Sequence, residues 1–209
     1  MYSYSTPSSE IIETLKLIPH PEGGHFAVTY VDEGKVASPY ASNKEERVVQ
    51  STIYYLLSVG HNVPDNGKEP PERLVGHSSA LGKLHKNKSP TMHLHHSGRA
   101  IYTLIEASPK PGKAPEVKQV VMGEDVSKGE TRQLMVDGNW WKVSEIPKED
   151  LEAVEKGQVD PERVGCLISE VVAPGFDWND HTWLDQKSLA GVFGDDKASI
   201  ARFTPYVHP

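Results

Sequence analysis

Four of the ten histidines of this chain fall within twelve positions of one stretch, Leu84-His85-Lys86-Asn87-Lys88-Ser89-Pro90-Thr91-Met92-His93-Leu94-His95-His96-Ser97-Gly98. The apolar run Ala100-Ile101-Tyr102-Thr103-Leu104-Ile105 follows almost directly and has the composition of a strand. Imidazole is the side chain best suited to bind a divalent metal or to move a proton near neutral pH. Histidines gathered where a loop leads into a strand therefore predict a pocket.

Strand patterns recur on both sides of this stretch, separated by turn residues. They cover residues 25–31, 51–57, 82–85, 92–95, 100–106, 116–122, 132–136, 140–143 and 166–172. Helical patterns are few and short, at residues 10–18, 149–156 and 185–193. Many short strands at a spacing of 8–12 residues predict an all-β sandwich or barrel.

Composition limits the classes of protein that fit. A chain of 209 residues without a repeat or linker predicts one domain, residues 11–209, after a flexible N-terminus at residues 1–10. The net charge of −7 and the lack of a basic run argue against nucleic acid as a partner. Cys166 is the single cysteine, which excludes an intrachain disulfide and fits a cytoplasmic protein. No apolar run approaches the ~20 residues that span a bilayer, so no membrane contact is expected.

Four segments, in this order, carry a resemblance. They are Leu17-Ile-Pro-His-Pro-Glu-Gly-Gly-His-Phe26, Gln50-Ser-Thr-Ile-Tyr-Tyr-Leu-Leu57, residues 82–98, and Leu167-Ile-Ser-Glu-Val-Val-Ala-Pro-Gly-Phe-Asp177. The chain resembles the cupins, and within them the Cupin_5-like family catalogued as a domain of unknown function. The resemblance implies an all-β double-stranded β-helix, or jelly roll, with a few short helices and a pocket in its mouth. It also implies a homodimer, and it makes the segments near 58–80 and 144–164 insertions.

The histidines allow two registers. His93 and His95 alternate on a strand and face the same side, as two ligands do in many metal-dependent cupins, but the glutamate that follows in those proteins is missing here. In the family register, His85 takes the place of a metal-type histidine, Thr91 falls where a glutamate often sits, and His93 is the recurring histidine. His85, His93 and His95 would together supply three ligands for one Zn, Fe, Mn or Ni ion. The alternative is a site without metal, in which His85 and His93 hydrogen-bond a substrate or each other.

Two carboxylates and a tyrosine are further candidates. Glu22 lies between a proline and paired glycines, where it either lines the pocket mouth or caps a turn. Glu170 shares a strand face with Ile168 and Val172, and a carboxylate buried there would have a raised pKa and serve as a general acid or base. An outward, solvated Glu170 is the alternative. Tyr54 and its neighbour Tyr55 point to opposite faces, so one of them faces the lumen; Tyr54 is the catalytic candidate.

Three more residues are candidates for ligand binding. Lys83 precedes His85 by two positions and can share its face and bind an anionic group, although a solvated lysine is the commoner case. Trp140 follows a hairpin turn and can stack on a planar or sugar-like ligand, or pack in the core. His181 lies beside two aspartates and can form a proton-transfer pair, or belong to a loop that covers the barrel end.

Three functions fit these residues. The first is a small-molecule isomerase, epimerase or lyase acting on a small polar metabolite, with His85 or His93 as base and Glu170 or a tyrosine as acid. The second is a metal-dependent dioxygenase or decarboxylase that uses the histidine cluster. The third is a non-catalytic protein that binds a small ligand in the same pocket. The first is the function that the sequence favours.

Overall fold

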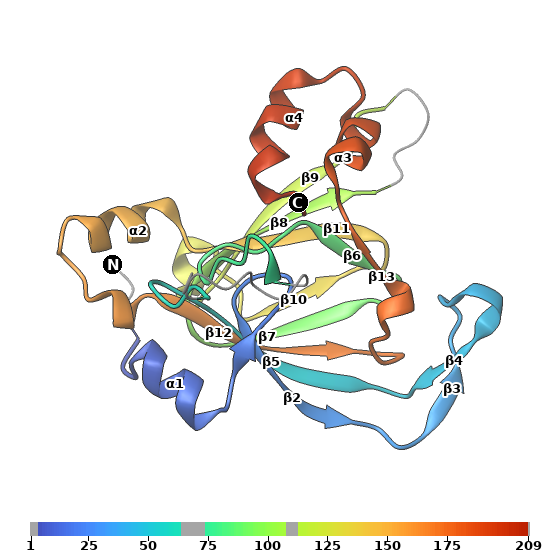
Figure 1. The fold of residues 1–209 in the computed structure, drawn as a ribbon, viewed down its shortest axis with the longest axis horizontal. Helices are drawn as coiled ribbons and strands as arrows, with labels where there is room; N and C mark the ends of the chain where they lie inside the picture. Colours follow the sequence, from blue (N-terminus) through green and yellow to red (C-terminus); the bar gives the residue numbers. More distant parts are fainter. Residues whose placement is uncertain (1–3, 64–73, 108–112, 209) are drawn as a thin grey trace.

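The computed structural model describes residues 4–63, 74–107 and 113–208, and shows two antiparallel sheets packed face to face (Figure 1). The larger sheet has the strand order β1 (Ile18–Pro19), β2 (His25–Val31), β5 (Ser51–Ser58), β12 (Gly165–Val172), β7 (Thr91–Gly98) and β10 (Gln133–Val136). The smaller has the order β13 (His181–Trp183), β6 (His85–Asn87), β11 (Trp140–Glu145), β8 (Ala100–Glu106) and β9 (Val117–Met122). The fold is the jelly roll that the sequence predicts.

A hydrophobic core fills the space between the two sheets. It contains Tyr55 and Leu57 from β5, Tyr102 and Leu104 from β8, and Ile168 from β12, all buried. The side chains of a strand alternate between its two faces, so every second residue of these strands faces the core. Some of these inward residues are polar. These polar residues form the candidate site.

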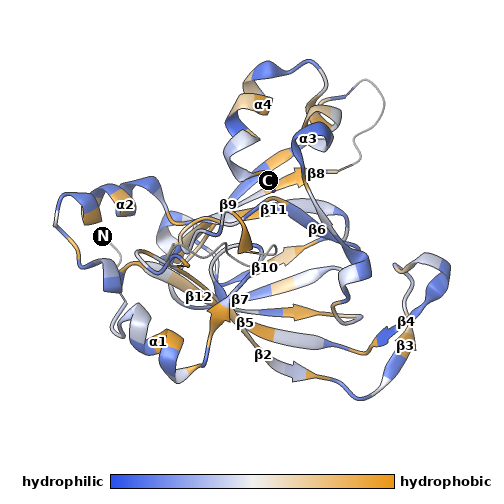
Figure 2. Ribbon diagram, in the orientation of Figure 1, coloured by the Kyte–Doolittle hydropathy of each residue, from blue (hydrophilic) through white to orange (hydrophobic). Residues whose placement is uncertain are grey.

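Helices cover the outer faces. In Figure 1, α3 (Gln186–Phe193) and α4 (Lys197–Phe203) lie over the smaller sheet, where Leu189, Phe193 and Phe203 pack on Trp141 and Val143 of β11. Helix α1 (Ser8–Thr14) lies beside β5, and α2 (Lys148–Glu155) is mostly hydrophilic along its length (Figure 2). None of the helices in the described ranges is long and apolar enough to cross a bilayer.

Several elements differ from the sequence prediction. The strand expected at residues 82–85 begins only at His85, because Gly82 and Lys83 bond instead to the backbone of Ser144 and Glu22. The three-residue strands β3 (Lys35–Ala37), β4 (Glu46–Val48) and β13 were not predicted, since three residues are too short for a periodic signal. Tyr4, in the segment expected to be flexible, is buried. The predicted insertion near 58–80 lies partly outside the described residues, and the one near 144–164 contains α2.

Candidate functional site

A lysine, a glutamate and a histidine meet between the two sheets. Lys142 comes from β11, Glu170 from β12 and His93 from β7, and the register places Glu170 opposite His93. Lys142 Nζ lies 3.0 Å from Glu170 Oε2 and 3.1 Å from His93 Nε2, while His93 Nε2 lies 3.3 Å from Glu170 Oε1. The exposed fractions are 4% for Lys142, 7% for Glu170 and 0% for His93, so all three are shielded from water.

The electrostatics of this cluster keep the carboxylate charged. Burial on its own raises the pKa of Glu170, but the Lys142 ammonium counteracts it and holds that pKa below its ordinary value. Burial lowers the pKa of His93, which favours the neutral imidazole. An ammonium has only donors, so Lys142 donates to Glu170 Oε2 and to the lone pair on Nε2 of neutral His93. The sequence-based expectation of a raised pKa for Glu170 is therefore wrong, because the Lys142 ammonium is buried beside the carboxylate and counteracts the effect of desolvation.

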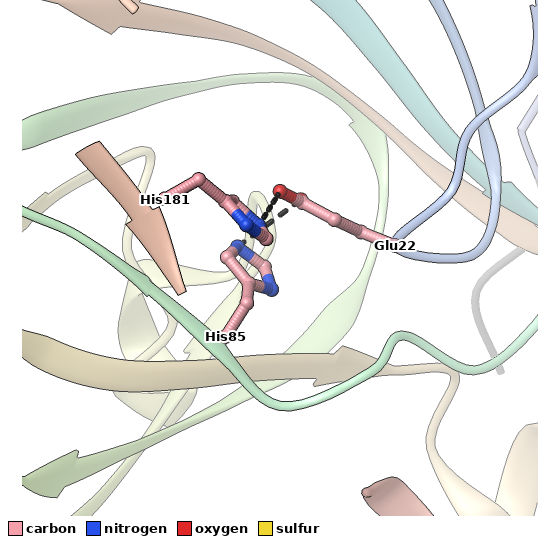
Figure 3. Close-up of side chains that lie close together, drawn as sticks. All are labelled: Glu22, His85 and His181. Carbon is pink, nitrogen blue, oxygen red and sulfur yellow. Dashed lines mark hydrogen bonds and ion pairs between the residues drawn. The ribbon is translucent and has the colours of Figure 1, made fainter. Parts of the chain in front are cut away.

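A second cluster lies nearby, where Glu22, His85 and His181 converge (Figure 3). Strands β13 and β6 pair so that His181 is opposite Asn87 and Trp183 is opposite His85, which makes His181 and His85 diagonal neighbours on one face. Their rings are nearly parallel, with centroids 5.3 Å apart. Glu22 Oε1 lies 3.0 Å from His181 Nε2, and Glu22 Oε2 lies 3.1 Å from His85 Nε2.

The loop that carries Glu22 depends on its two glycines. Gly23 has φ +96°, and a Cβ at this position would lie 2.3 Å from the carbonyl oxygen of Leu81. The close approach lets the backbone N–H of Lys83 donate to the carbonyl of Glu22 at 2.7 Å. This bond fixes the glutamate loop directly beside the start of β6, and so beside His85.

The imidazole of His85 directs an unprotonated ring nitrogen, Nε2, toward the carboxylate of Glu22. His85 Nδ1 lies 2.8 Å from the carbonyl oxygen of Lys83, which can only accept, so Nδ1 carries the proton and Nε2 carries a lone pair. Although Nε2 is 3.1 Å from Glu22 Oε2, the contact lacks hydrogen-bond geometry, and this buried nitrogen has no hydrogen-bond partner. Burial lowers the pKa of His85 to about 3, which favours the neutral ring.

Glu22 is surrounded by imidazoles. Burial raises the pKa of its carboxyl, but His85, His20 and His181 outweigh this and lower the pKa well below its ordinary value. His20 Nδ1 accepts the backbone N–H of Glu22 at 3.0 Å, which leaves the proton of neutral His20 on Nε2. Burial lowers the pKa of His20 as well. Glu22 is thus held as a carboxylate, which suits a cation or a hydrogen-bond donor.

Two cavities meet at these clusters. A large one of about 360 Å³ is bordered mainly by apolar side chains, with polar ones from His20, Glu22, Asn87, Ser51 and Glu170. A small one of about 10 Å³, room for roughly one water, has Glu22, His85, Lys142 and Glu170 in its lining. Glu22 and Glu170 border both cavities, so a molecule bound in either one contacts these carboxylates.

Comparison with known proteins identifies the family. The family model Cupin_5, described as "Cupin superfamily (DUF985)", matches residues 9–64 and 74–184. The chain belongs to the Cupin_5 family. The uncharacterized protein YML079W of Saccharomyces cerevisiae is 34% identical over 208 residues, covering 94% of this cupin and 86% of the yeast protein.

Solved structures agree on the fold of this cupin. A hypothetical protein from Leishmania major has a TM-score of 0.68 and 24% identity, and the match covers 94% of this chain and 97% of that one. Protein SO0799 from Shewanella oneidensis has a TM-score of 0.67 and 19% identity, with coverages of 98% and 99%. At these identities the likeness concerns the jelly roll itself.

The structure brings together several of the residues predicted for the site of this cupin. His85, Glu22 and His181 form one cluster, and His93 and Glu170 belong to the other. Ile168 and Val172 share the inward face of Glu170, as alternation predicts. His181 pairs with Glu22 and not with a neighbouring aspartate, because Asp180 binds Arg47 through two hydrogen bonds.

The predicted metal ligands are not one cluster. Among the described residues, Glu22, His85 and His181 form the single group of three whose ligand atoms all lie within 4.8 Å of one another. His95 faces inward, but its Nε2 bonds the carbonyl of Gly98 at 2.7 Å, because the turn at Gly98 folds back toward it. The prediction that His85, His93 and His95 bind one metal is therefore wrong, because their ligand atoms do not converge on one point.

Three other candidates do not point a free polar group into either cavity. Tyr54 points outward and packs beside α1, so Tyr55 is the tyrosine that faces the lumen. Trp140 packs at the edge of the core with the Lys118 ammonium 4.5 Å from its ring centroid, and borders neither cavity. Lys83 borders the small cavity, but its ammonium donates to the carbonyl of Val75.

Sequence reasoning missed Lys142 and His20. Lys142 stands in the run Trp140-Trp141-Lys142-Val143, and a lysine inside so apolar a strand is the signal that would have marked it. His20 precedes the Pro-Glu-Gly-Gly turn, and no spacing rule distinguishes it from a turn residue.

Proposed function

We propose that this cupin is an enzyme that moves a proton on a small molecule, as isomerases, epimerases and lyases do. Glu170 is the proton acceptor, and Lys142 is the cation that stabilises negative charge on the substrate. His93 touches neither cavity and acts as a positioning residue for Glu170 and Lys142. The observation that supports this most directly is an ion pair of 3.0 Å, almost fully buried, that borders a cavity.

Stability alone does not explain why the ion pair between Lys142 and Glu170 is buried. The desolvation of two charges costs several kcal/mol for each ion, and replacement by apolar residues of similar size is often neutral or stabilising. Ionisable groups shifted by burial and by a specific partner gather at functional sites. Glu170 also borders both cavities and Lys142 the smaller one, so both groups can meet a bound molecule.

The chemistry follows from the two groups. A substrate carbonyl oxygen in the small cavity would accept a hydrogen bond from Lys142 Nζ, which weakens the pull of the ammonium on Glu170. The carboxylate then takes a proton from the carbon beside the carbonyl, and the C–H electrons move onto the oxygen as an enolate held by Lys142. Return of the proton to another face or carbon gives an isomer, whereas loss of a leaving group gives a lyase product.

The large cavity favours a substrate with an apolar body. Its described lining includes Phe26, Ile53, Val172, Phe176 and Trp178, but no lysine or arginine. The two ionised carboxylates at its base would repel a phosphate or carboxylate group. A neutral carbonyl compound with an aliphatic or aromatic portion fits better than the small polar metabolite that the sequence suggested.

Solvent deuterium exchange tests the proposal. Neutral ketones and aldehydes are screened for binding by thermal shift, and the binders are incubated with the protein in D2O and followed by NMR. Wild type should exchange a C–H of at least one binder. Glu170→Gln should bind the same compound and lower the exchange rate by at least about 100-fold, the lower range for a general base. Glu116→Gln, an exposed residue that borders neither cavity, is the matched control and should exchange as wild type.

Binding without catalysis is the competing outcome. If the binders exchange no C–H in wild type, or if Glu170→Gln exchanges as fast as wild type, proton transfer by Glu170 is refuted. The protein would then be a ligand-binding cupin.

A further inference from the structure

Glu22, His85 and His181 have the composition of a metal site. Two imidazoles and one carboxylate are a ligand set used for zinc and for non-haem iron. The three residues come from three distant parts of the chain, the loop after β1, strand β6 and strand β13. Their ligand atoms nevertheless all lie within 4.8 Å of one another, and no acidic run in the sequence produces this grouping.

The orientation of His85 is the strongest sign of a bound cation. Its Nδ1 donates to the Lys83 carbonyl, and its Nε2 lone pair faces Glu22 Oε2 at 3.1 Å without a hydrogen bond. A lone pair and a carboxylate oxygen repel each other when nothing lies between them. A metal ion removes the repulsion, and a backbone carbonyl on the far nitrogen is the usual way in which a ligand histidine is oriented.

The distances suit a first-row metal ion. Bonds of about 2.0–2.2 Å at tetrahedral angles place ligand atoms about 3.3 Å apart. The separations of 3.0 Å between Glu22 Oε1 and His181 Nε2, and of 3.1 Å between Glu22 Oε2 and His85 Nε2, need only small shifts to reach this value.

The surroundings of His181 hold it in place. The preceding residue, Asp180, accepts two hydrogen bonds from Arg47, of 2.8 and 3.2 Å, and an ion pair of 3.1 Å from Lys88. The Trp183 ring lies edge-on to the His181 ring, with centroids 4.4 Å apart. This rigid setting lowers the cost of keeping the imidazole in a ligand geometry.

We propose that Glu22, His85 and His181 bind one divalent transition-metal ion at the junction of the two cavities. Three protein ligands leave at least one coordination position, and Glu22 borders both cavities, so that position is accessible to a small molecule. Zinc and ferrous iron are the ions that this ligand set fits best. The inference does not depend on the proposed proton transfer, which uses Glu170 and Lys142.

Direct metal binding tests the site without any substrate. Full-length protein without a histidine tag is stripped with a chelator and dialysed against Zn²⁺ or Co²⁺, and the bound metal is measured by elemental analysis. Wild type should bind one equivalent. Glu22→Gln and His181→Gln should each weaken binding by about 100-fold or more, because loss of an outer-shell partner alone costs about 10- to 100-fold. His96→Gln, an exposed histidine outside the cluster, is the matched control and should bind as wild type.

A measurement on the unmodified chain covers the case in which a variant does not fold. On addition of Zn²⁺, the imidazole ¹⁵N resonances of His85 and His181 should shift strongly, while those of His95 and His96 should not. The proposal is overturned if wild type retains no metal, if the Glu22 and His181 variants bind as wild type, or if only other histidines shift. Since no turnover is measured, absence of metal leaves the proton-transfer proposal standing, and absence of deuterium exchange leaves the metal site standing.

Discussion

Lys142→Met is expected to destabilise the protein in a way that depends on pH. The substitution keeps the length of the side chain but removes the ammonium 3.0 Å from Glu170 Oε2, in a place where both partners are almost fully buried. Removal of one partner of a buried pair costs about 3–5 kcal/mol, because the other charge stays behind without compensation. For a chain of this size that corresponds to a fall in melting temperature of about 6–20 °C at pH 7.

The sign of the pH dependence follows from the carboxyl group. In wild type the pKa of Glu170 is lowered, so its stabilising contribution is complete above the unfolded pKa and is lost only as the pH falls through the folded value. Without the ammonium, burial raises that pKa, and the variant instead loses stability as the pH rises. The gap between the two proteins should therefore widen from pH 4 to pH 7, by up to about 1.4 kcal/mol per pH unit.

The neighbours of Glu170 support this direction. The titratable groups that face it are His93, Glu22, His20, Tyr55 and Tyr102. Of these, His93 is the one in direct contact, and it can take up the proton that replaces the lost ammonium. Whether the proton resides on Glu170 or on His93, the variant binds it more tightly than wild type does, so the sign is unchanged.

Urea denaturation at pH 4, 5.5 and 7 measures the effect. Lys148→Met, whose side chain is 88% exposed, is the control and should stay within about 0.5 kcal/mol of wild type at each pH. The double variant Lys142→Met, Glu170→Leu should recover most of the loss, since both charges are gone. A Lys142→Met protein as stable as wild type at pH 7, or a loss that is the same at every pH, would refute the reasoning.

Three further predictions concern other parts of the fold. Gly23→Ala should lower stability by more than about 1 kcal/mol in urea denaturation, because φ is +96° and the new Cβ would lie 2.3 Å from the Leu81 carbonyl oxygen. Asp180→Ala should lower the melting temperature by an amount equivalent to about 1–3 kcal/mol, because it removes two hydrogen bonds from the Arg47 guanidinium, which keeps Glu45 and Asp177 as partners. The Cys166 thiol, whose pKa burial raises, should resist a thiol reagent in the folded protein and react fully in denaturant, as mass spectrometry would show.

The fold was largely predictable because strand alternation and turn residues are local signals. That Ile168, Glu170 and Val172 share one strand face follows from a period of two alone. The same rule left Tyr54 and Tyr55 undecided, since alternation states that they differ but not which faces the lumen. In the structure, Tyr54 and Leu56 lie on the face of β5 that packs against α1, so Tyr55 faces the lumen. This packing joins distant parts of the chain and cannot be read from the local sequence.

The site was predictable only in part, because its residues meet across long distances in the chain. Glu22 and His181 are 159 residues apart, and their contact needs the pairing of β13 with β6 as well as the backbone bond that holds the Glu22 loop beside β6. Nothing local in the sequence specifies that pairing. His95 shows the opposite error, since local spacing grouped it with His93, whereas the turn at Gly98 gives its ring a backbone partner.

The two clusters are linked by the small cavity between them. Its volume of about 10 Å³ admits roughly one water-sized group, and its border includes Glu22 and His85 from one cluster and Lys142 and Glu170 from the other. An oxygen atom of a bound molecule in this space is therefore within reach of the Lys142 ammonium and of the metal position proposed beside His85. The Lys142 ammonium and a metal ion held by Glu22, His85 and His181 would both stabilise negative charge on such an atom, so loss of either should impair the same proton-transfer step. Their effects would then be less than additive in a double variant, which is the behaviour of groups that act on one atom.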